Sequence, residues 1–203
     1  MSHYFSEQQQ AASAEREIVV DTVDPPLVLR TDRGVFSHGR LDSGTALLLR
    51  RAPAPPDSGV FLDLGCGAGP IALTLARLAP AARVIAVDVN ERARRLCAAN
   101  AARNGLDNVA VAAPDTVDAA KRFDLIWSNP PIRVGKAELH ELLQLWLGRL
   151  TTTGAAVLVV QRHLGADSLQ RWLVEQGWPT ERLASSKGYR LIDVRPAVDP
   201  PRP

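Results

Sequence analysis

The sequence predicts an α/β protein with a Rossmann-like, doubly wound, mostly parallel sheet of seven strands, an antiparallel C-terminal strand and a short N-terminal extension. Three observations support this fold class. Short apolar runs alternate with longer amphipathic segments from residue 60 onward. Glycine or proline stands at the ends of several of these segments. Two runs near the C-terminus flank Lys187-Gly188, as expected for an antiparallel pair joined by a turn.

The apolar runs predict the strands, because they are short and bounded by turn residues. We place strands at 18–20, 27–29, 60–64, 83–87, 109–112, 123–127, 155–160, 182–186 and 189–194. The longer segments predict helices, because apolar residues recur on one face. We place helices at 43–49, 70–78, 91–104, 137–150 and 166–176. Asp42 suits the cap of the first helix, and Pro70 suits the first turn of the second.

A proline-rich stretch divides the chain. Pro53, Pro55 and Pro56 lie close together before the first long strand, and such a composition is typical of a linker. We therefore expect residues 1–56 to form an N-terminal extension and residues 57–203 to form the core fold.

Composition sets broad limits on function. Hydrophobic residues make up 46% and charged residues 23% of 203 residues, as in ordinary globular proteins. The net charge of +2 permits RNA binding without demanding it. Cys66 and Cys97 lack metal-ligand spacing, so we expect no metal site and a reducing environment. No apolar run has the length of a membrane span and no signal-peptide core is evident, so we expect a cytoplasmic location and no membrane partner.

A glycine loop directly follows the strand at 60–64. It reads Asp63-Leu64-Gly65-Cys66-Gly67-Ala68-Gly69 and precedes a predicted helix. Glycines allow a tight turn and a close approach to a ligand, and the helix start offers free N–H groups. The spacing lacks one residue of the dinucleotide fingerprint, which disfavours a nicotinamide cofactor. Asp63 suits an ammonium group better than a pyrophosphate.

Acidic residues follow the next two strands. Asp88, with Val89 beside it, ends the second strand of the core, where an acid can accept both hydroxyls of a ribose. Asp115 follows the third strand and is placed to accept from an adenine amino group. Each acid alone could be a solvated strand end, but acids after three consecutive strands beside a glycine loop indicate a nucleoside site.

Asn129, Pro130 and Pro131 follow the strand at 123–127. One interpretation is that these residues form a rigid turn and have no part in the chemistry. They could also form an amino-group clamp, because the Asn129 side-chain oxygen and the Pro130 carbonyl are both hydrogen-bond acceptors. Two acceptors would hold both hydrogens of an amino group and direct its nitrogen lone pair, and alignment is the main task when the methyl donor is already activated.

This assembly resembles the class I S-adenosylmethionine-dependent methyltransferases over about residues 60–195. The resemblance implies S-adenosylmethionine as cofactor, with Gly65–Gly69 holding its methionine part, Asp88 its ribose and Asp115 its adenine. Cys66 belongs to this loop and lacks a neighbouring base that could activate it. Asn129 would border both the cofactor and the substrate. Residues 57–203 would then be a methyltransferase core, with 1–56 covering its active site.

The Asn-Pro-Pro-aromatic form of the motif is typical of methyltransferases acting on amino or amide nitrogens, although Ile132 replaces the aromatic residue here. Further segments resemble the catalytic domain of small-subunit ribosomal RNA guanine-N2 methyltransferases and their single-domain relatives. These segments are His3-Tyr4-Phe5-Ser6, residues 34–45 and Arg133-Val134-Gly135-Lys136. The resemblance implies that the substrate is contacted by Phe36, Arg40, Ile132, Arg133 and Lys136. The alternatives are that Phe36 packs beneath its own loop and that Arg133 and Lys136 are ordinary charges at a helix start.

The leading hypothesis is methylation of an exocyclic base nitrogen in RNA, with guanine N2 in ribosomal RNA as the favoured target and the small subunit as a partner. The target base has to leave its stack, since a base inside a helix is out of reach. One alternative is methylation of a protein glutamine or a DNA adenine, which uses the same clamp. Another is a non-catalytic protein that binds the cofactor or RNA. The oligomeric state stays open.

Overall fold

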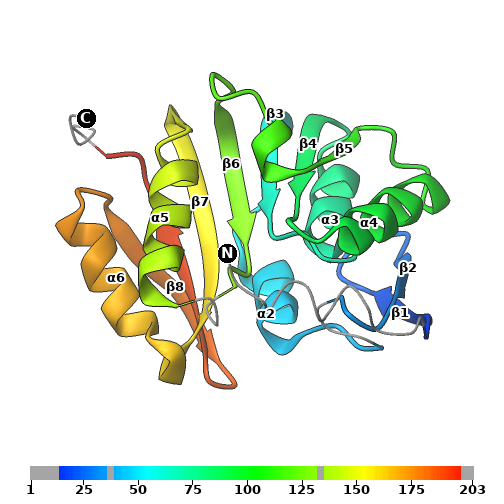
Figure 1. Cartoon of the computed structure of the whole chain (residues 1–203), viewed down its shortest axis with the longest axis horizontal. Helices are drawn as coiled ribbons and strands as arrows, with labels where there is room; N and C mark the ends of the chain where they lie inside the picture. The colour runs from blue at the N-terminus through cyan, green and yellow to red at the C-terminus, as the bar shows by residue number, and fades with distance from the viewer. Residues whose placement is uncertain (1–13, 36–38, 132–134, 198–203) are drawn as a thin grey trace.

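A computed structural model describes residues 14–35, 39–131 and 135–197 (Figure 1). The main sheet has seven strands in the order β5-β4-β3-β6-β7-β9-β8. Only β9 runs against the others, since it pairs antiparallel with both β7 and β8. The strands of this sheet are β3 (Ser58–Leu64), β4 (Ala81–Val87), β5 (Val109–Ala112), β6 (Phe123–Ser128), β7 (Leu150–Gln161), β8 (Thr180–Ser186) and β9 (Tyr189–Val194). The predicted fold class is confirmed.

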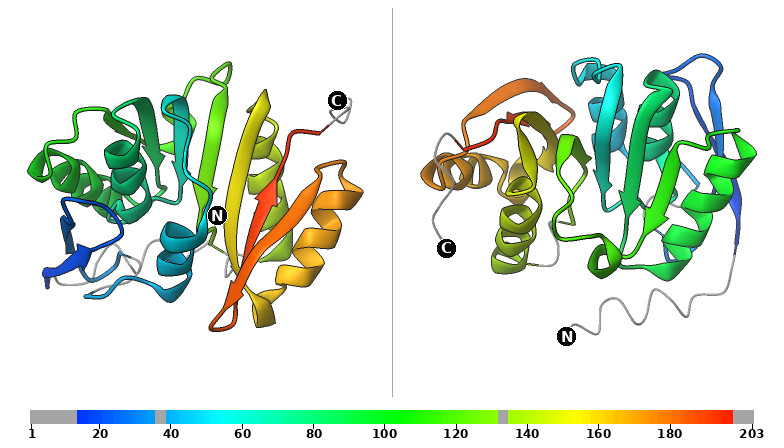
Figure 2. Two further views of the ribbon diagram at one scale, coloured as in Figure 1. Left: turned by 180° about the vertical axis from the view of Figure 1, so that it is seen from behind. Right: turned by 90° about the horizontal axis from the view of Figure 1, so that it is seen from above.

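Helices cover both faces of the sheet (Figures 1 and 2). They are α2 (Ser43–Arg51), α3 (Pro70–Leu78), α4 (Glu91–Arg103), α5 (Lys136–Leu147) and α6 (Ala166–Glu175), with short 3-10 turns at Pro114–Thr116 (η1) and Arg162–Leu164 (η3). Successive residues of β6 point to opposite faces. Leu125 and Trp127 pack with α2, α3 and α4, whereas Ile126 packs with α5 and α6.

An asparagine of α4 and the asparagine that caps its C-terminus hold the N-terminal hairpin, which consists of β1 (Arg16–Val20) and β2 (Leu27–Thr31). Asn100 exchanges two hydrogen bonds with the backbone of Arg30, at 2.8 and 2.9 Å. Asn104 does the same with Val28, at 3.2 and 3.0 Å. The two side chains thus replace a neighbouring strand along β2. Asn100 also donates to the Ala68 carbonyl at 2.8 Å, which ties the hairpin to the glycine loop.

The N-terminal segment also shares its apolar core with the rest of the chain. Side chains of β1, β2 and α2 belong to the same buried cluster as those of α3, β3 and β6. The segment before the proline-rich linker is therefore packed against the sheet layer.

One helix boundary is wrong. The predicted helix at 137–150 ends at Leu147, and Leu150 begins β7 instead. Leu150 has the right spacing from Trp146 to continue the apolar face. Gly148 and the threonines at 151–153, however, favour an end to the helix and an extended chain. Leu150 lies opposite Phe123 and is buried within the sheet.

The strand order reverses between β3 and β6. From β3 the chain builds outward through β4 to β5, and from β6 it builds through β7 in the other direction. The glycine loop after β3 and the Asn-Pro-Pro turn after β6 therefore meet at a topological switch point, where open α/β sheets bind ligands. Ser128 Oγ donates to the Leu64 carbonyl at 2.7 Å and joins the two strand ends.

Candidate active site

The glycine loop leaves open space where side chains would stand. Gly65 and Gly67 have φ values of 79° and 54°, in the left-handed region that favours glycine. A Cβ at Gly65 would have no neighbour within 4 Å, and one at Gly67 would meet only the Val35 side chain at 4.0 Å. The structure thus leaves the backbone at Gly65 and Gly67 uncovered on this side, and a contact with the cofactor stays a prediction.

Gly69 has a different role. Its φ is 95°, and a Cβ there would lie 2.8 Å from both Cys97 Sγ and Leu73 Cδ1. The residue therefore permits close packing of α3 against α4. The sequence predicts Gly69 as a cofactor ligand, and that role stays a prediction. The side on which a Cβ would stand faces the protein interior.

Gly69→Ala is expected to destabilise the fold by about 2–4 kcal/mol, because left-handed strain adds to overpacking. Gly105→Ala is the matched control. Gly105 also has a positive φ, of 64°, but a Cβ there meets nothing within 4 Å. The control should lose only about 1–2 kcal/mol. Urea denaturation measures both, and equal losses would contradict the packing role.

Asp63 lies beneath the loop and is fully buried. Its Oδ2 accepts from the Ala72 N–H at 2.9 Å, at the start of α3. Its Oδ1 is buried and has no hydrogen-bond partner among the described residues. Burial raises the pKa of Asp63 to about 8. A buried carboxyl with an unsatisfied oxygen beside an open glycine loop suits a positively charged group of a ligand.

Asp88 supports the loop from β4. Its Oδ2 accepts from Gly67 N at 2.9 Å and its Oδ1 from Asn90 N at 2.8 Å. Burial raises the pKa of Asp88. Each carboxylate oxygen keeps a further lone pair, so the group can still accept from hydroxyls. Val89 beside it is 54% exposed. Asn90 caps α4 and donates to the Gly34 carbonyl at 2.9 Å, a link that the sequence analysis missed.

Asp115 lies apart from the loop. It is exposed in η1, after β5, which is two strands from β3 in the sheet. It borders a separate, open hollow together with Leu145 and Arg149. The structure thus gathers Asp63 and Asp88 around the loop, whereas contact between Asp115 and an adenine stays a prediction.

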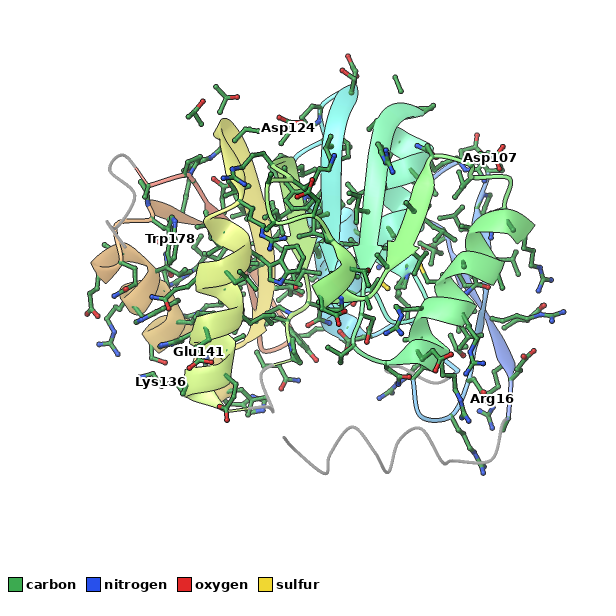
Figure 3. All side chains as sticks on the ribbon, turned by 45° about the horizontal axis from the view of Figure 1, so that its top comes forward. Arg16, Asp107, Asp124, Lys136, Glu141 and Trp178 are labelled. Carbon is green, nitrogen blue, oxygen red and sulfur yellow. The ribbon has the colours of Figure 1, made fainter. Side chains whose placement is uncertain are left out.

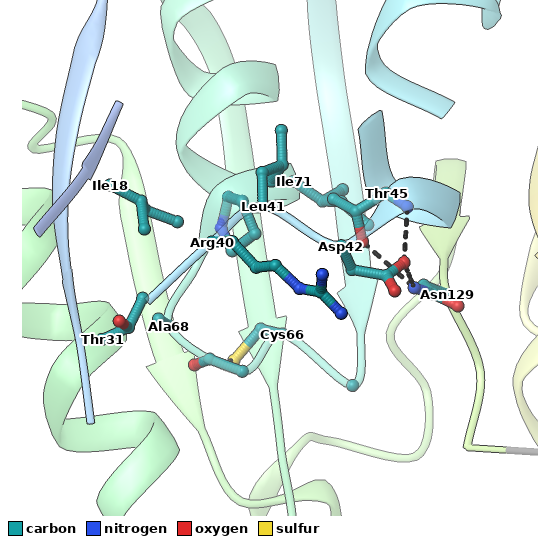
Figure 4. Close-up of a pocket in the computed structure, with 13 residues that line it drawn as sticks. Ile18, Thr31, Arg40, Leu41, Asp42, Thr45, Cys66, Ala68, Ile71 and Asn129 are labelled. Carbon is teal, nitrogen blue, oxygen red and sulfur yellow. Dashed lines mark hydrogen bonds between the residues drawn. The ribbon is translucent and has the colours of Figure 1, made fainter. Parts of the chain in front are cut away.

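Asn129 faces the first turn of α2 (Figure 4). Its Nδ2 donates to Asp42 Oδ2 at 2.9 Å and to Thr45 Oγ1 at 3.1 Å. The side-chain oxygen lies on the other side of the amide. Pro130 is buried and Pro131 is exposed. The sequence analysis recognised Asp42 only as a helix cap, because nothing in the sequence shows which distant residue lies beside that cap.

A hollow lies between the glycine loop, the start of α2 and Asn129. We call it the loop hollow. Its walls come from the N-terminal segment, the glycine loop with the start of α3, and the turn after β6 (Figure 4). It is lined by Ile18, Thr31, Arg40, Leu41, Asp42, Thr45, Gly65, Cys66, Gly67, Ala68, Pro70, Ile71 and Asn129.

The structure describes two of the five predicted substrate residues. Arg40 lines the loop hollow, next to Asp42. Lys136 is exposed at the first turn of α5 (Figure 3). Phe36, Ile132 and Arg133 lie outside the described residues.

Cys66 carries a protonated thiol. A hydrogen bond with the Cys97 thiol and then burial raise the pKa of Cys66 well above its ordinary value. The residue is 3% exposed, and a thiol in this state is a poor nucleophile. Within residues 14–35, 39–131 and 135–197, no three His, Cys, Asp or Glu side chains gather as metal ligands do, and no helix has the length and apolarity to cross a bilayer.

Comparisons with known proteins show which family the chain resembles. The chain is 34% identical over 196 residues to the uncharacterized protein YbxB of Bacillus subtilis, covering 95% of this chain and 98% of that protein. It is 36% identical over 176 residues to ribosomal RNA small subunit methyltransferase C of Pseudomonas aeruginosa, covering 80% of this chain and 49% of that one. The chain therefore spans about half the length of such methyltransferases.

A solved structure matches as well. The 16S rRNA N2 methyltransferase of T. thermophilus, in complex with AdoMet and guanosine, superposes with a TM-score of 0.75 and 25% identity, covering 91% of this chain and 51% of that chain. The family model for the methyltransferase small domain matches residues 26–193, from β2 to β9. The match spans both the glycine loop and the Asn-Pro-Pro turn, and the chain belongs to the methyltransferase small domain family.

Proposed function

We propose that this methyltransferase uses S-adenosylmethionine to methylate the exocyclic amino group of a base in ribosomal RNA, with guanine N2 as the target. The observation that carries the proposal is the Asn129 amide. The amide nitrogen donates both of its hydrogens within the protein, one to Asp42 and one to Thr45. What it can offer a substrate is therefore an acceptor oxygen, which suits an amino group.

The residues around the loop fit S-adenosylmethionine. Bound there, this cofactor supplies an activated methyl group on a sulfonium. The open Cβ sides of Gly65 and Gly67 leave room for close backbone contact. Asp88 is placed to accept from ribose hydroxyls, and the unpaired Asp63 oxygen favours the ammonium group. Asp115 and Val89 would border the nucleoside part.

The Asn-Pro-Pro turn would align the target nitrogen. Asn129 Oδ1 and the Pro130 carbonyl accept one amino hydrogen each and point the lone pair at the methyl group. The methyl group would come from the bound cofactor, the clamp would hold the amino nitrogen toward it, and the surplus amino proton would be lost to solvent. Pro131 stiffens the turn and lowers the entropy lost on alignment. Arg40 and Lys136, with Phe36, Ile132 and Arg133, would contact the RNA.

The relatives support this substrate. The P. aeruginosa protein and the T. thermophilus protein are both named as methyltransferases of small-subunit ribosomal RNA. The structure of the T. thermophilus protein holds guanosine together with AdoMet. This chain spans about half the length of both proteins.

A labelling experiment tests the proposal. Purified protein and methyl-labelled S-adenosylmethionine are supplied to ribosomal RNA, small subunits, transfer RNA, DNA and total protein from cells that lack the enzyme. We expect label in ribosomal RNA or small subunits, lost with Asn129→Ala, and N2-methylguanosine on nuclease digestion. Label only in protein or DNA would move the assignment to glutamine or adenine. Absence of label with intact cofactor binding would favour a binding protein and overturn the proposal.

A further inference from the structure

We propose that Asp42 and Thr45 are positioning residues that set the orientation of the Asn129 amide, so that its oxygen and not its nitrogen meets the target amino group. This inference rests on the proposed function. Asp42 and Thr45 can set this orientation without contacting the substrate. The two act from the first turn of α2, 87 and 84 residues away from Asn129 in the chain.

The chemistry of the partners decides which way the amide faces. A carboxylate has no hydrogen to donate, so the atom of Asn129 within 2.9 Å of Asp42 Oδ2 has to be the nitrogen. The second hydrogen on that nitrogen is directed to Thr45 Oγ1 at 3.1 Å. A flipped amide would set its oxygen against the carboxylate and its NH₂ against the substrate NH₂. Both contacts would then be repulsive, and the clamp would be lost.

The two positioning residues are themselves held firmly. Asp42 Oδ2 also accepts from the Thr45 N–H at 2.9 Å, which caps α2. Thr45 is 4% exposed, so its hydroxyl has little access to water as a substitute partner. The amide orientation is thus tied to the start of a helix that packs against β7 and β9.

A second layer of contacts comes from the C-terminal strands. Gln161 Nε2, at the end of β7, donates to Tyr189 Oη at 2.7 Å. Tyr189 Oη in turn donates to Asp42 Oδ1 at 3.4 Å. The ring lies so close to α2 that a Cβ on Gly44 would stand 2.7 Å from Tyr189 Cε1. Glycine at position 44 therefore permits the approach that brings the tyrosine to the carboxylate.

A purely structural role, in which Asp42 and Thr45 only cap and bury α2, makes a different prediction. Thr45→Val keeps the shape of the side chain, its backbone N–H and therefore the cap. It removes only the hydroxyl that accepts from Asn129. Thr45→Ser keeps that hydroxyl and removes a methyl group instead. The pair thus separates amide orientation from packing.

The first arm of the test is kinetic. We expect Thr45→Val to lower kcat about tenfold, with the melting temperature and the Kd for S-adenosylmethionine close to wild type, and Thr45→Ser to recover most of the rate. In an Asn129→Ala background, Thr45→Val should cause no further loss, because its effect passes through the amide. An unchanged kcat in Thr45→Val, or the same tenfold loss in both backgrounds, would overturn the inference.

The second arm needs no RNA and so separates this inference from the proposed function. In ¹⁵N-labelled protein, the Asn129 side-chain NH₂ pair is identified by its disappearance in Asn129→Ala. We expect Thr45→Val to move chiefly one of its two proton resonances and Thr45→Ser to leave both near their places. Equal, small changes in both would contradict the assigned contacts. If the two variants show this pattern but the wild-type protein labels no RNA, the proposed function alone is overturned.

Discussion

Asn129→Ala is expected to lower kcat for methyl transfer about 10²–10³-fold, the usual loss when one preorganised hydrogen-bonding group is removed from an active site. The loss should exceed that of Thr45→Val, since the acceptor itself is removed rather than its support. Rapid-quench measurement of one turnover with labelled cofactor reports the chemical step. The Kd for S-adenosylmethionine should change much less, because the glycine loop and Asp88 stay in place.

Asn129→Asp is the sharper variant. It keeps an acceptor oxygen and nearly the same shape, but it sets a second carboxyl against Asp42, where the native amide donates at 2.9 Å. Two adjacent carboxylates repel while both are ionised, so the variant is assayed at a pH high enough to ionise both. We expect activity near that of Asn129→Ala. A rate near wild type would mean that an acceptor in any orientation suffices, which contradicts the amide clamp as described.

Asp63→Asn is expected to change how stability depends on pH. Burial raises the pKa of Asp63 from 3.8 to about 8 in the folded protein. Between these values the folded state binds a proton that the unfolded state has released, so the free energy of unfolding falls as pH rises. The fall is on the order of 5 kcal/mol across the window. Relative to the wild type, Asp63→Asn should therefore gain stability from about pH 4 to about pH 8.

Urea denaturation at several pH values within this window measures the difference. The surface carboxyls are present in both proteins, so their titration cancels in the comparison, whereas Asp88 interacts with Asp63 and its titration contributes to the difference. Parallel curves would show that Asp63 titrates near its ordinary pKa in the fold. Saturating S-adenosylmethionine should reduce the slope in the wild type, because a nearby ammonium group favours the ionised carboxylate.

Local chemistry in the sequence was enough to place most elements. Pro70 begins α3, Gly105 follows the end of α4, and β9 has the predicted bounds. The glycine loop and the Asn-Pro-Pro turn were assigned to strand ends without the structure. These features depend on backbone conformation, capping and periodicity. All three are determined by residues that are close together in the chain.

Tertiary structure alone decided which of these features meet. The sequence does not show that Asn129 faces Asp42, that Asn100 completes the backbone of β2, or that Gly69 packs on Cys97 while Gly65 stays open. It equally suggests one acidic cluster, although Asp115 lies over a separate hollow. Periodicity tells which face of an element is buried. The partner on that face depends on strand order and register, which arise from packing across the whole sheet.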